Sequence, residues 1–189
     1  MIPRSLVLWL FLGAANSFGA GQHARRPEKP PDTGPVTVLR SATLQVFIAS
    51  DAVSVFSYLS DQNKLAEWLA DQAILEPQFG GSCHFRWKNE EPVDGVVTDF
   101  LAANTLAYTW KHPSDEAETQ VRFKLSPQGG RTLVQLELHG YTTAEALDKS
   151  LKSWVFNLQN LKSVMENQVD LRQELNRKPA RYVPRHRAG

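Results

Sequence analysis

Apolar and polar residues alternate with a period of two in several short stretches of the chain. The clearest stretch is 82–88, where Cys83, Phe85 and Trp87 alternate with polar side chains. This alternation predicts strands that each have one apolar face. Further strands are expected at 41–49, 73–78, 95–101, 105–110, 120–125 and 132–139. The connections are short, the last being the Ser-Pro-Gln-Gly-Gly segment 126–130, and strands connected in this way pair antiparallel.

Helical patterns come before and after most of these strands. Ser50 and Asp51 are residue types that favour helix N-caps, and apolar residues then recur at helical spacing as far as Leu59. A second short helix is expected over 62–70. After the last strand, Thr142 and Glu145 have the spacing of a capping box. The long helix expected there has one apolar stripe, formed by Leu147, Leu151, Trp154, Val155, Leu158, Leu161 and Met165.

The apolar face of the sheet and the stripe of the long helix have to cover each other. We therefore predict an α+β fold in which a curved antiparallel sheet of about six to seven strands wraps round a long C-terminal helix. Two short helices follow the first strand. Large aromatic rings dominate the facing surfaces, and two interpretations stay open: the rings surround an apolar cavity, or they fill the core. Under the first interpretation, the predicted ligand-binding residues are Trp68, Phe85, Trp87, Tyr108, Trp110, Phe123, Leu136, Trp154 and Leu158.

Composition divides the 189 residues into four parts. Residues 1–20 contain a positive start, a compact apolar run and small residues, in the order typical of a signal peptide. Residues 21–40 are rich in proline, glycine and charge, and are expected to form a disordered linker. The domain is expected over 41–172. Residues 173–189 are expected to be a basic flexible tail.

The residues that could carry chemistry give little support to catalysis. A net charge of +1 gives no field that would attract nucleic acid, and a single cysteine excludes an internal disulfide. Cys83 lies on the apolar phase of its strand, so it is expected to be buried and protonated. His112 could line the rim of a pocket. Asp99 shares a phase with Val97, and two alternatives stay open: it faces inward and could act as an acid or base, or it lies at an exposed strand end, which is the more common outcome. We expect no catalytic residue, metal or cofactor.

A series of segments, in the right order, resembles the START-like superfamily, and within it the domain family named after the activator of the ninety-kilodalton heat-shock ATPase. The segments are 47–56 (FIASDAVSVF), 65–69 (LAEWL), 76–87 (EPQFGGSCHFRW), 95–97 (GVV), 106–110 (LAYTW), 130–136 (GRTLVQL) and 154–161. The chain departs from the family at 49–52, where members often have a proline, and at Trp68-Leu69, where they often have two aromatics. The resemblance implies a helix-grip fold with a cavity between sheet and helix. It does not imply one activity, because the superfamily includes carriers, receptors, cyclases and co-chaperones.

Three hypotheses about function follow. The first is a non-catalytic module that binds a small hydrophobic molecule or lipid; the signal peptide would make it secreted or periplasmic. The second is a co-chaperone-like interaction domain with a chaperone partner, which a cytoplasmic location would favour. The third is a cyclase-like or hydrolase-like enzyme, which needs a polar residue inside the pocket. We expect a monomer or weak dimer, no nucleic-acid partner, and no stable membrane span, because no apolar run reaches about 18 residues.

Overall fold

The computed structural model describes residues 38–115 and 117–176. Its strands are β1 (Arg40–Ile48), β2 (Gln72–Leu75), β3 (Ser82–Arg86), β4 (Val93–Leu101), β5 (Thr105–Trp110), β6 (Thr119–Gln128) and β7 (Arg131–Tyr141). Its helices are α1 (Ala52–Ser60), α2 (Gln62–Trp68), α3 (Ala144–Asn167) and α4 (Leu171–Asn176). The signal peptide predicted at 1–20 lies outside the described residues. So do most of the predicted linker and the end of the predicted tail, and these three assignments stay predictions.

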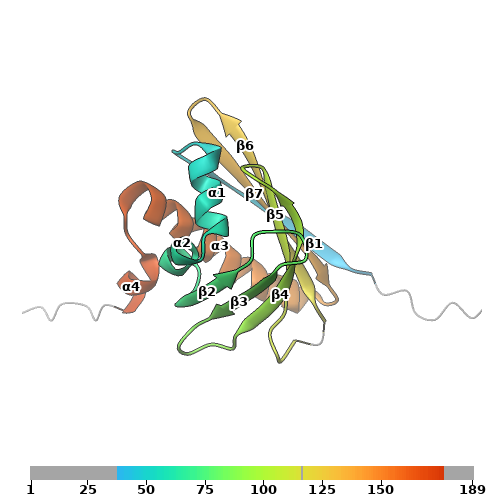
Figure 1. Ribbon diagram of the computed structural model, residues 1–189. Helices are drawn as coiled ribbons and strands as arrows, with labels where there is room; N and C mark the ends of the chain where they lie inside the picture. Colours follow the sequence, from blue (N-terminus) through green and yellow to red (C-terminus); the bar gives the residue numbers. More distant parts are fainter. Residues whose placement is uncertain (1–37, 116, 177–189) are drawn as a thin grey trace, which may run out of the picture. The chain divides into compact units, whose positions relative to one another are not determined.

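The seven strands form one antiparallel sheet in the order β1-β7-β6-β5-β4-β3-β2. The helices lie on one side of this sheet, and α3 follows the last strand directly (Figure 1). The predicted α+β helix-grip architecture is therefore confirmed, including the two short helices after the first strand. The helix α4 was not predicted, and it continues to Asn176, beyond the expected end of the domain at 172. In the described part of the chain, no helix is both long and apolar enough to cross a membrane.

Side-chain caps fix where the helices begin. The carboxylate of Asp51 accepts a hydrogen bond from the backbone N–H of Ser54 at 2.9 Å, which confirms the N-cap expected at the start of α1. At α3 the prediction is wrong by one residue. Thr143, not Thr142, is the N-cap, and its hydroxyl accepts from the N–H of Ala146 at 3.1 Å. Thr142 and Glu145 therefore do not form the predicted capping box.

Turns and bulges set which side chains face the helices. The β6–β7 hairpin closes with Gly129 and Gly130, both with positive φ, and Gln128 pairs with Arg131. The loop is therefore two residues long rather than the predicted 126–130. Bulges interrupt β4 near Thr98 and the β1–β7 pairing near Gly140, which has a φ of 89°. Each bulge adds one residue to one strand and so reverses the inward phase beyond it.

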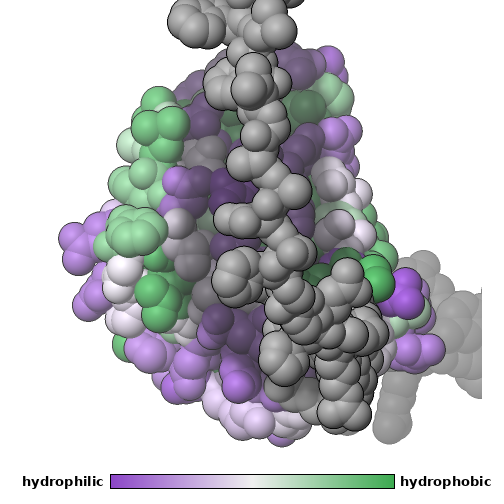
Figure 2. Space-filling model, turned by 90° about the vertical axis from the view of Figure 1, so that its right-hand side faces the viewer, coloured by the Kyte–Doolittle hydropathy of each residue, from purple (hydrophilic) through white to green (hydrophobic). Residues whose placement is uncertain are grey.

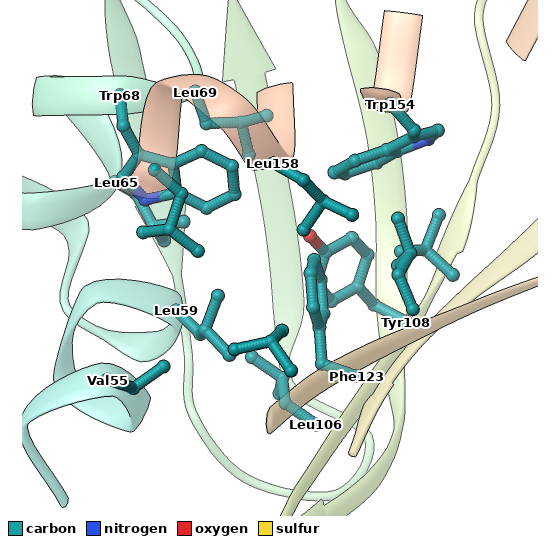
Figure 3. Close-up of a cluster of buried hydrophobic side chains, with 14 of the residues drawn as sticks. Val55, Leu59, Leu65, Trp68, Leu69, Leu106, Tyr108, Phe123, Trp154 and Leu158 are labelled. Carbon is teal, nitrogen blue, oxygen red and sulfur yellow. The ribbon is translucent and has the colours of Figure 1, made fainter. Parts of the chain in front are cut away.

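The core lies between the sheet and the helices (Figure 3). Its largest fully buried side chains are rings from both layers: Trp68, Phe85, Tyr108, Phe123 and Trp154. The strands can approach closely here because residue 95 is glycine. A Cβ at Gly95 would lie 2.0 Å from the carbonyl oxygen of Thr109 on β5. Any other residue would force β4 and β5 apart next to the aromatic core.

The opposite face of the sheet carries charged side chains. Arg122 donates to Asp99 at 2.6 Å, and Lys124 donates to Glu137 at 2.7 Å. This is the side that Figure 2 views, and many of the residues visible near its middle are hydrophilic. Along β6 and β7, one face therefore contacts the core and the other is more exposed, as the period-two pattern predicts, whereas β5 is buried on both faces.

Candidate functional site

A pocket of about 520 Å³ lies beside the filled core, between the first half of α3 and the ends of several strands. Ligand sites commonly measure about 300–1,000 Å³. From the sheet side, the pocket is lined by Trp87, Glu90, Trp110, His112, Ser114, Asp115, Ala117, Thr119, Gly140, Tyr141, Thr142 and Thr143. From the helices and the residue after α2, it is lined by Leu69, Ala146, Lys149, Ser150, Ser153, Trp154, Phe156, Asn157 and Arg172.

Three tryptophans form one aromatic surface of this pocket, which we call the tryptophan floor (Trp87, Trp110 and Trp154). The ring centroids of Trp110 and Trp154 are 5.0 Å apart, and those of Trp110 and Trp87 are 6.1 Å apart, both in edge-on arrangements. Trp87 is fixed by its indole N–H, which donates to the carbonyl of Leu69 at 2.8 Å. These contacts hold the floor in one arrangement, so a guest would meet a preformed aromatic surface.

Polar groups surround the floor. The hydroxyls of Tyr141 and Ser150 are 2.5 Å apart, so strand β7 and helix α3 are joined at the pocket. Burial raises the pKa of Tyr141, which therefore stays a neutral phenol at physiological pH. The ring of His112 contacts that of Trp110 edge-on, with centroids 6.2 Å apart. Lys149 is exposed at the same pocket. The pocket thus combines an apolar surface with several hydrogen-bonding groups at its edge.

Arg172 lines the pocket and belongs to a polar group that we call the C-terminal latch (Asn160, Asp170 and Arg172), in which Asn160 is buried and the other two are partly buried. The Arg172 guanidinium donates to the carbonyls of Ala66 and Ala70 at 2.9 and 2.8 Å, and to Asp170 at 2.9 Å. These carbonyls lie at the C-terminal end of α2, where carbonyl groups lack partners within the helix and carry partial negative charge. The latch therefore fixes α4 across α2, and Arg172 becomes part of the pocket wall.

Asn160 connects the latch to α3. Its side chain is fully buried and donates to the carbonyl of Trp68 at 2.7 Å and to Asp170 at 3.0 Å. Its oxygen accepts from the N–H of Leu171 at 2.7 Å. Burial acts to raise the pKa of Asp170, but the hydrogen bonds from Arg172 and Asn160 outweigh it, so the pKa lies below its usual value. Asp170 therefore remains charged opposite Arg172.

The structure separates the nine predicted ligand-binding residues into two groups. Trp87, Trp110 and Trp154 line the pocket. The other six are fully or almost fully buried in the core and do not line it: Trp68, Phe85, Tyr108, Phe123, Leu136 and Leu158. The aromatic rings in this group pack on one another; for example, the ring centroids of Phe85 and Tyr108 are 5.6 Å apart. Each of the two interpretations therefore describes some of the aromatic residues. Most of the rings fill the core, and the three tryptophans border a space beside it.

Tyr141 and Ser150 are pocket residues that sequence reasoning missed. Val134, Leu136 and Leu138 point inward at even positions, so an odd-numbered tyrosine is expected to face solvent. The bulge at Gly140 reverses this phase and buries Tyr141. A glycine directly before an aromatic residue at the end of a strand was the available signal.

Asp99 and Cys83 do not provide a catalytic group in the pocket. The idea that Asp99 faces inward is wrong, because the bulge near Thr98 turns it to the outer face, where it pairs with Arg122. Cys83 is fully buried, and burial raises the pKa of its thiol to about 12, with a smaller contribution from the charge of Asp94. A thiol in this state is a poor nucleophile at neutral pH. Residues 38–115 and 117–176 contain no group of three or more histidine, cysteine or acidic side chains placed to hold a metal ion.

Comparison with known proteins decides the family. The family model described as activator of Hsp90 ATPase homolog 1-like protein matches residues 50–166, more than half of the chain. The chain belongs to this family. The activator-like match covers the chain from the residue before Asp51 almost to the end of α3, so it includes strands β2 to β7, both short helices and most of the pocket, but not β1. The predicted superfamily is thereby confirmed. No protein with a curated description matches the chain.

Solved structures support the activator-like fold. CalU16 from Micromonospora echinospora is 20% identical, with a TM-score of 0.59 over 70% of this chain and 83% of that one. MLL2253 from Mesorhizobium loti is 19% identical, with a TM-score of 0.63 over 69% and 99%. The Aha1 dimer from Colwellia psychrerythraea is 18% identical, with a TM-score of 0.60 over 68% and 97%. At these identities the likeness concerns the fold alone.

Proposed function

We propose that this domain binds a small, largely apolar molecule in the pocket between α3 and the ends of β5, β6 and β7, without changing it chemically. The observation that supports this most is the tryptophan floor, which borders a space of about 520 Å³ beside a core that is otherwise filled. A rigid aromatic surface with a few hydrogen-bonding groups at its edge is typical of small-molecule sites.

The expected affinity is modest. A guest that hides roughly 300 Å² of apolar surface gains about 7 kcal/mol, at about 25 cal/mol/Å². Association costs about 4–15 kcal/mol in lost freedom. Apolar contact alone therefore gives permissive binding, with Kd values in the micromolar to millimolar range. Tighter and more selective binding requires hydrogen bonds from the ligand to the polar groups of the pocket.

The proposal is tested by blocking the pocket from α3. Ser153 lines it and is exposed, so Ser153→Phe places a ring in the space without disturbing the core. We expect this change to weaken binding of 2-ethylnaphthalene at least tenfold in equilibrium dialysis. Lauric acid should change the tryptophan fluorescence of the unmodified protein, because three of the four tryptophans in the described residues line the pocket.

The matched control is Gln159→Phe, which adds the same ring at an exposed position of α3 that does not line the pocket. It is expected to leave both signals unchanged. Equal effects of the two substitutions, or no response of the unmodified protein to either compound, would contradict the proposal.

The family description supports a second candidate, an interaction domain that acts on a chaperone ATPase through its surface. The same experiment separates the two. If the domain acts only through its surface, neither compound should change the signals of the unmodified protein, and Ser153→Phe should have no effect. If the domain binds a ligand, the unmodified protein should respond and Ser153→Phe should weaken that response.

A further inference from the structure

The hydroxyl of Tyr108 is an unpartnered polar group inside the core. Tyr108 is 1% exposed, and its oxygen is a buried side-chain atom of the described chain with no hydrogen-bond partner. Its ring packs against Phe85, Trp110 and Phe123, with centroids 5.6, 6.2 and 6.3 Å away. A buried hydroxyl without a partner destabilises a folded protein, and buried tyrosine hydroxyls usually find one. Phenylalanine would fill this site without that cost.

The direction of this hydroxyl relates it to the pocket. In Figure 3 the oxygen of Tyr108 points away from the sheet toward Leu158 on α3. Leu69 and Trp154 appear on either side of Leu158 in the same view, and both line the pocket. Leu158 does not line it. A change in the rotamer of Leu158 would therefore extend the pocket toward the hydroxyl, and such side-chain changes are common on binding.

We propose that Tyr108 is the inner hydrogen-bond partner of the bound molecule, and that this molecule is an uncharged, largely apolar compound with a carbonyl or hydroxyl group at its buried end. This inference rests on the proposed function. Tyr108, which does not line the preformed pocket, becomes a ligand-binding residue under this proposal. The ligand's apolar part lies on the tryptophan floor, and its polar end passes Leu158 to reach the hydroxyl of Tyr108.

The surroundings of the hydroxyl select for an uncharged group. Phe85, Phe123 and Leu158 are buried apolar neighbours in the core, and a carboxylate placed among them would lose its hydration without gaining an ion pair. Burial raises the pKa of Tyr108 well above its usual value, so it remains a neutral donor throughout the physiological pH range. The carboxylate of a fatty acid would instead remain at the edge of the pocket, where Lys149 lies.

The test compares two probes that differ only in a carbonyl group, 2-acetylnaphthalene and 2-ethylnaphthalene. We expect Tyr108→Phe to weaken binding of the ketone about three- to tenfold, the range that one hydrogen bond contributes. Binding of the hydrocarbon should change less than twofold. Infrared spectroscopy should show the carbonyl stretch of the bound ketone at lower frequency in the unmodified protein than in Tyr108→Phe. The melting temperature of the free variant should equal or exceed that of the unmodified protein, because the variant loses an unpartnered group.

Tyr141→Phe tests the alternative position for the carbonyl, because it removes a hydroxyl that lines the edge of the pocket and already has a partner, Ser150. If Tyr141→Phe and not Tyr108→Phe weakens ketone binding selectively, the carbonyl lies at the edge of the pocket and the inference is wrong. The inference is also wrong if Tyr108→Phe lowers the melting temperature, because the hydroxyl then has a partner such as an internal water. It is wrong as well if Tyr108→Phe weakens the binding of the ketone and of the hydrocarbon equally. If neither probe binds the unmodified protein, the proposed function itself fails. The two failures are therefore distinguishable.

Discussion

Replacing Trp154 by alanine is expected to lower the free energy of unfolding by about 3–5 kcal/mol, which is among the largest effects of a single substitution in a core. Trp154 is only 1% exposed, although one side of it borders the pocket. Its ring contacts those of Trp110 at 5.0 Å and Phe123 at 5.8 Å. Alanine removes both contacts and leaves a cavity between α3 and the sheet that the neighbouring rings cannot fill.

Urea unfolding, followed by circular dichroism, measures this loss. Val155→Ala is the control, because Val155 is the next residue of α3 and is 48% exposed. It should change stability by no more than about 0.5 kcal/mol. A loss below about 1.5 kcal/mol for Trp154→Ala would show that the ring borders the pocket without supporting the core, since burial of a large side chain contributes more than this. Trp154→Phe keeps a ring in place and should show an intermediate loss.

Replacing Asn160 by alanine is expected to lower the free energy of unfolding by about 2–4 kcal/mol, because it removes the side-chain partner of two backbone groups, one at a buried and one at a partly buried hydrogen bond. These are the carbonyl of Trp68 and the N–H of Leu171. The latch also loses the hydrogen bond from Asn160 to Asp170, so the attachment of α4 weakens. Hydrogen exchange in α4 should therefore increase more than in β6 or β7.

Asn157→Ala provides the comparison for this prediction. Asn157 lies one turn earlier on α3 and is only half-buried at the pocket. The same change of side chain there should alter stability by no more than about 0.5 kcal/mol. Similar losses at both positions would show that the latch hydrogen bonds contribute little, and that α4 is held by other contacts.

The sheet and helix α3 could be predicted well from the sequence, because the apolar residues of both recur with a regular period. The alternation at 82–88 identified β3 and the inward direction of Cys83, Phe85 and Trp87, of which the first two are fully buried. The stripe predicted on α3 was correct at Trp154, Leu158 and Leu161, which are buried. Leu147 and Leu151 also pack against the core, although they are only partly buried. The stripe was wrong at Val155, which is 48% exposed.

The pocket could not be predicted to the same extent, for identifiable reasons. One extra residue in a strand reverses its inward phase, and no periodic pattern indicates where such a bulge occurs. The bulge near Gly140 therefore hid the inward direction of Tyr141, and the bulge near Thr98 could not be used to decide between the two alternatives for Asp99. The latch was missed for another reason. It consists of polar residues whose partners are far away in the sequence, such as Asn160 and Trp68.

A guest bound in the pocket lies against the tryptophan floor, and the indole resonances measure its presence most directly. In a ¹⁵N-labelled protein titrated with 2-acetylnaphthalene, the indole N–H signals of Trp87, Trp110 and Trp154 should shift together and saturably. The signal of Trp68 should stay in place, because its N–H donates to the carbonyl of Tyr58, away from the pocket. If Trp68 shifts as much as the other three, or if none of the four signals moves, the pocket is not the binding site.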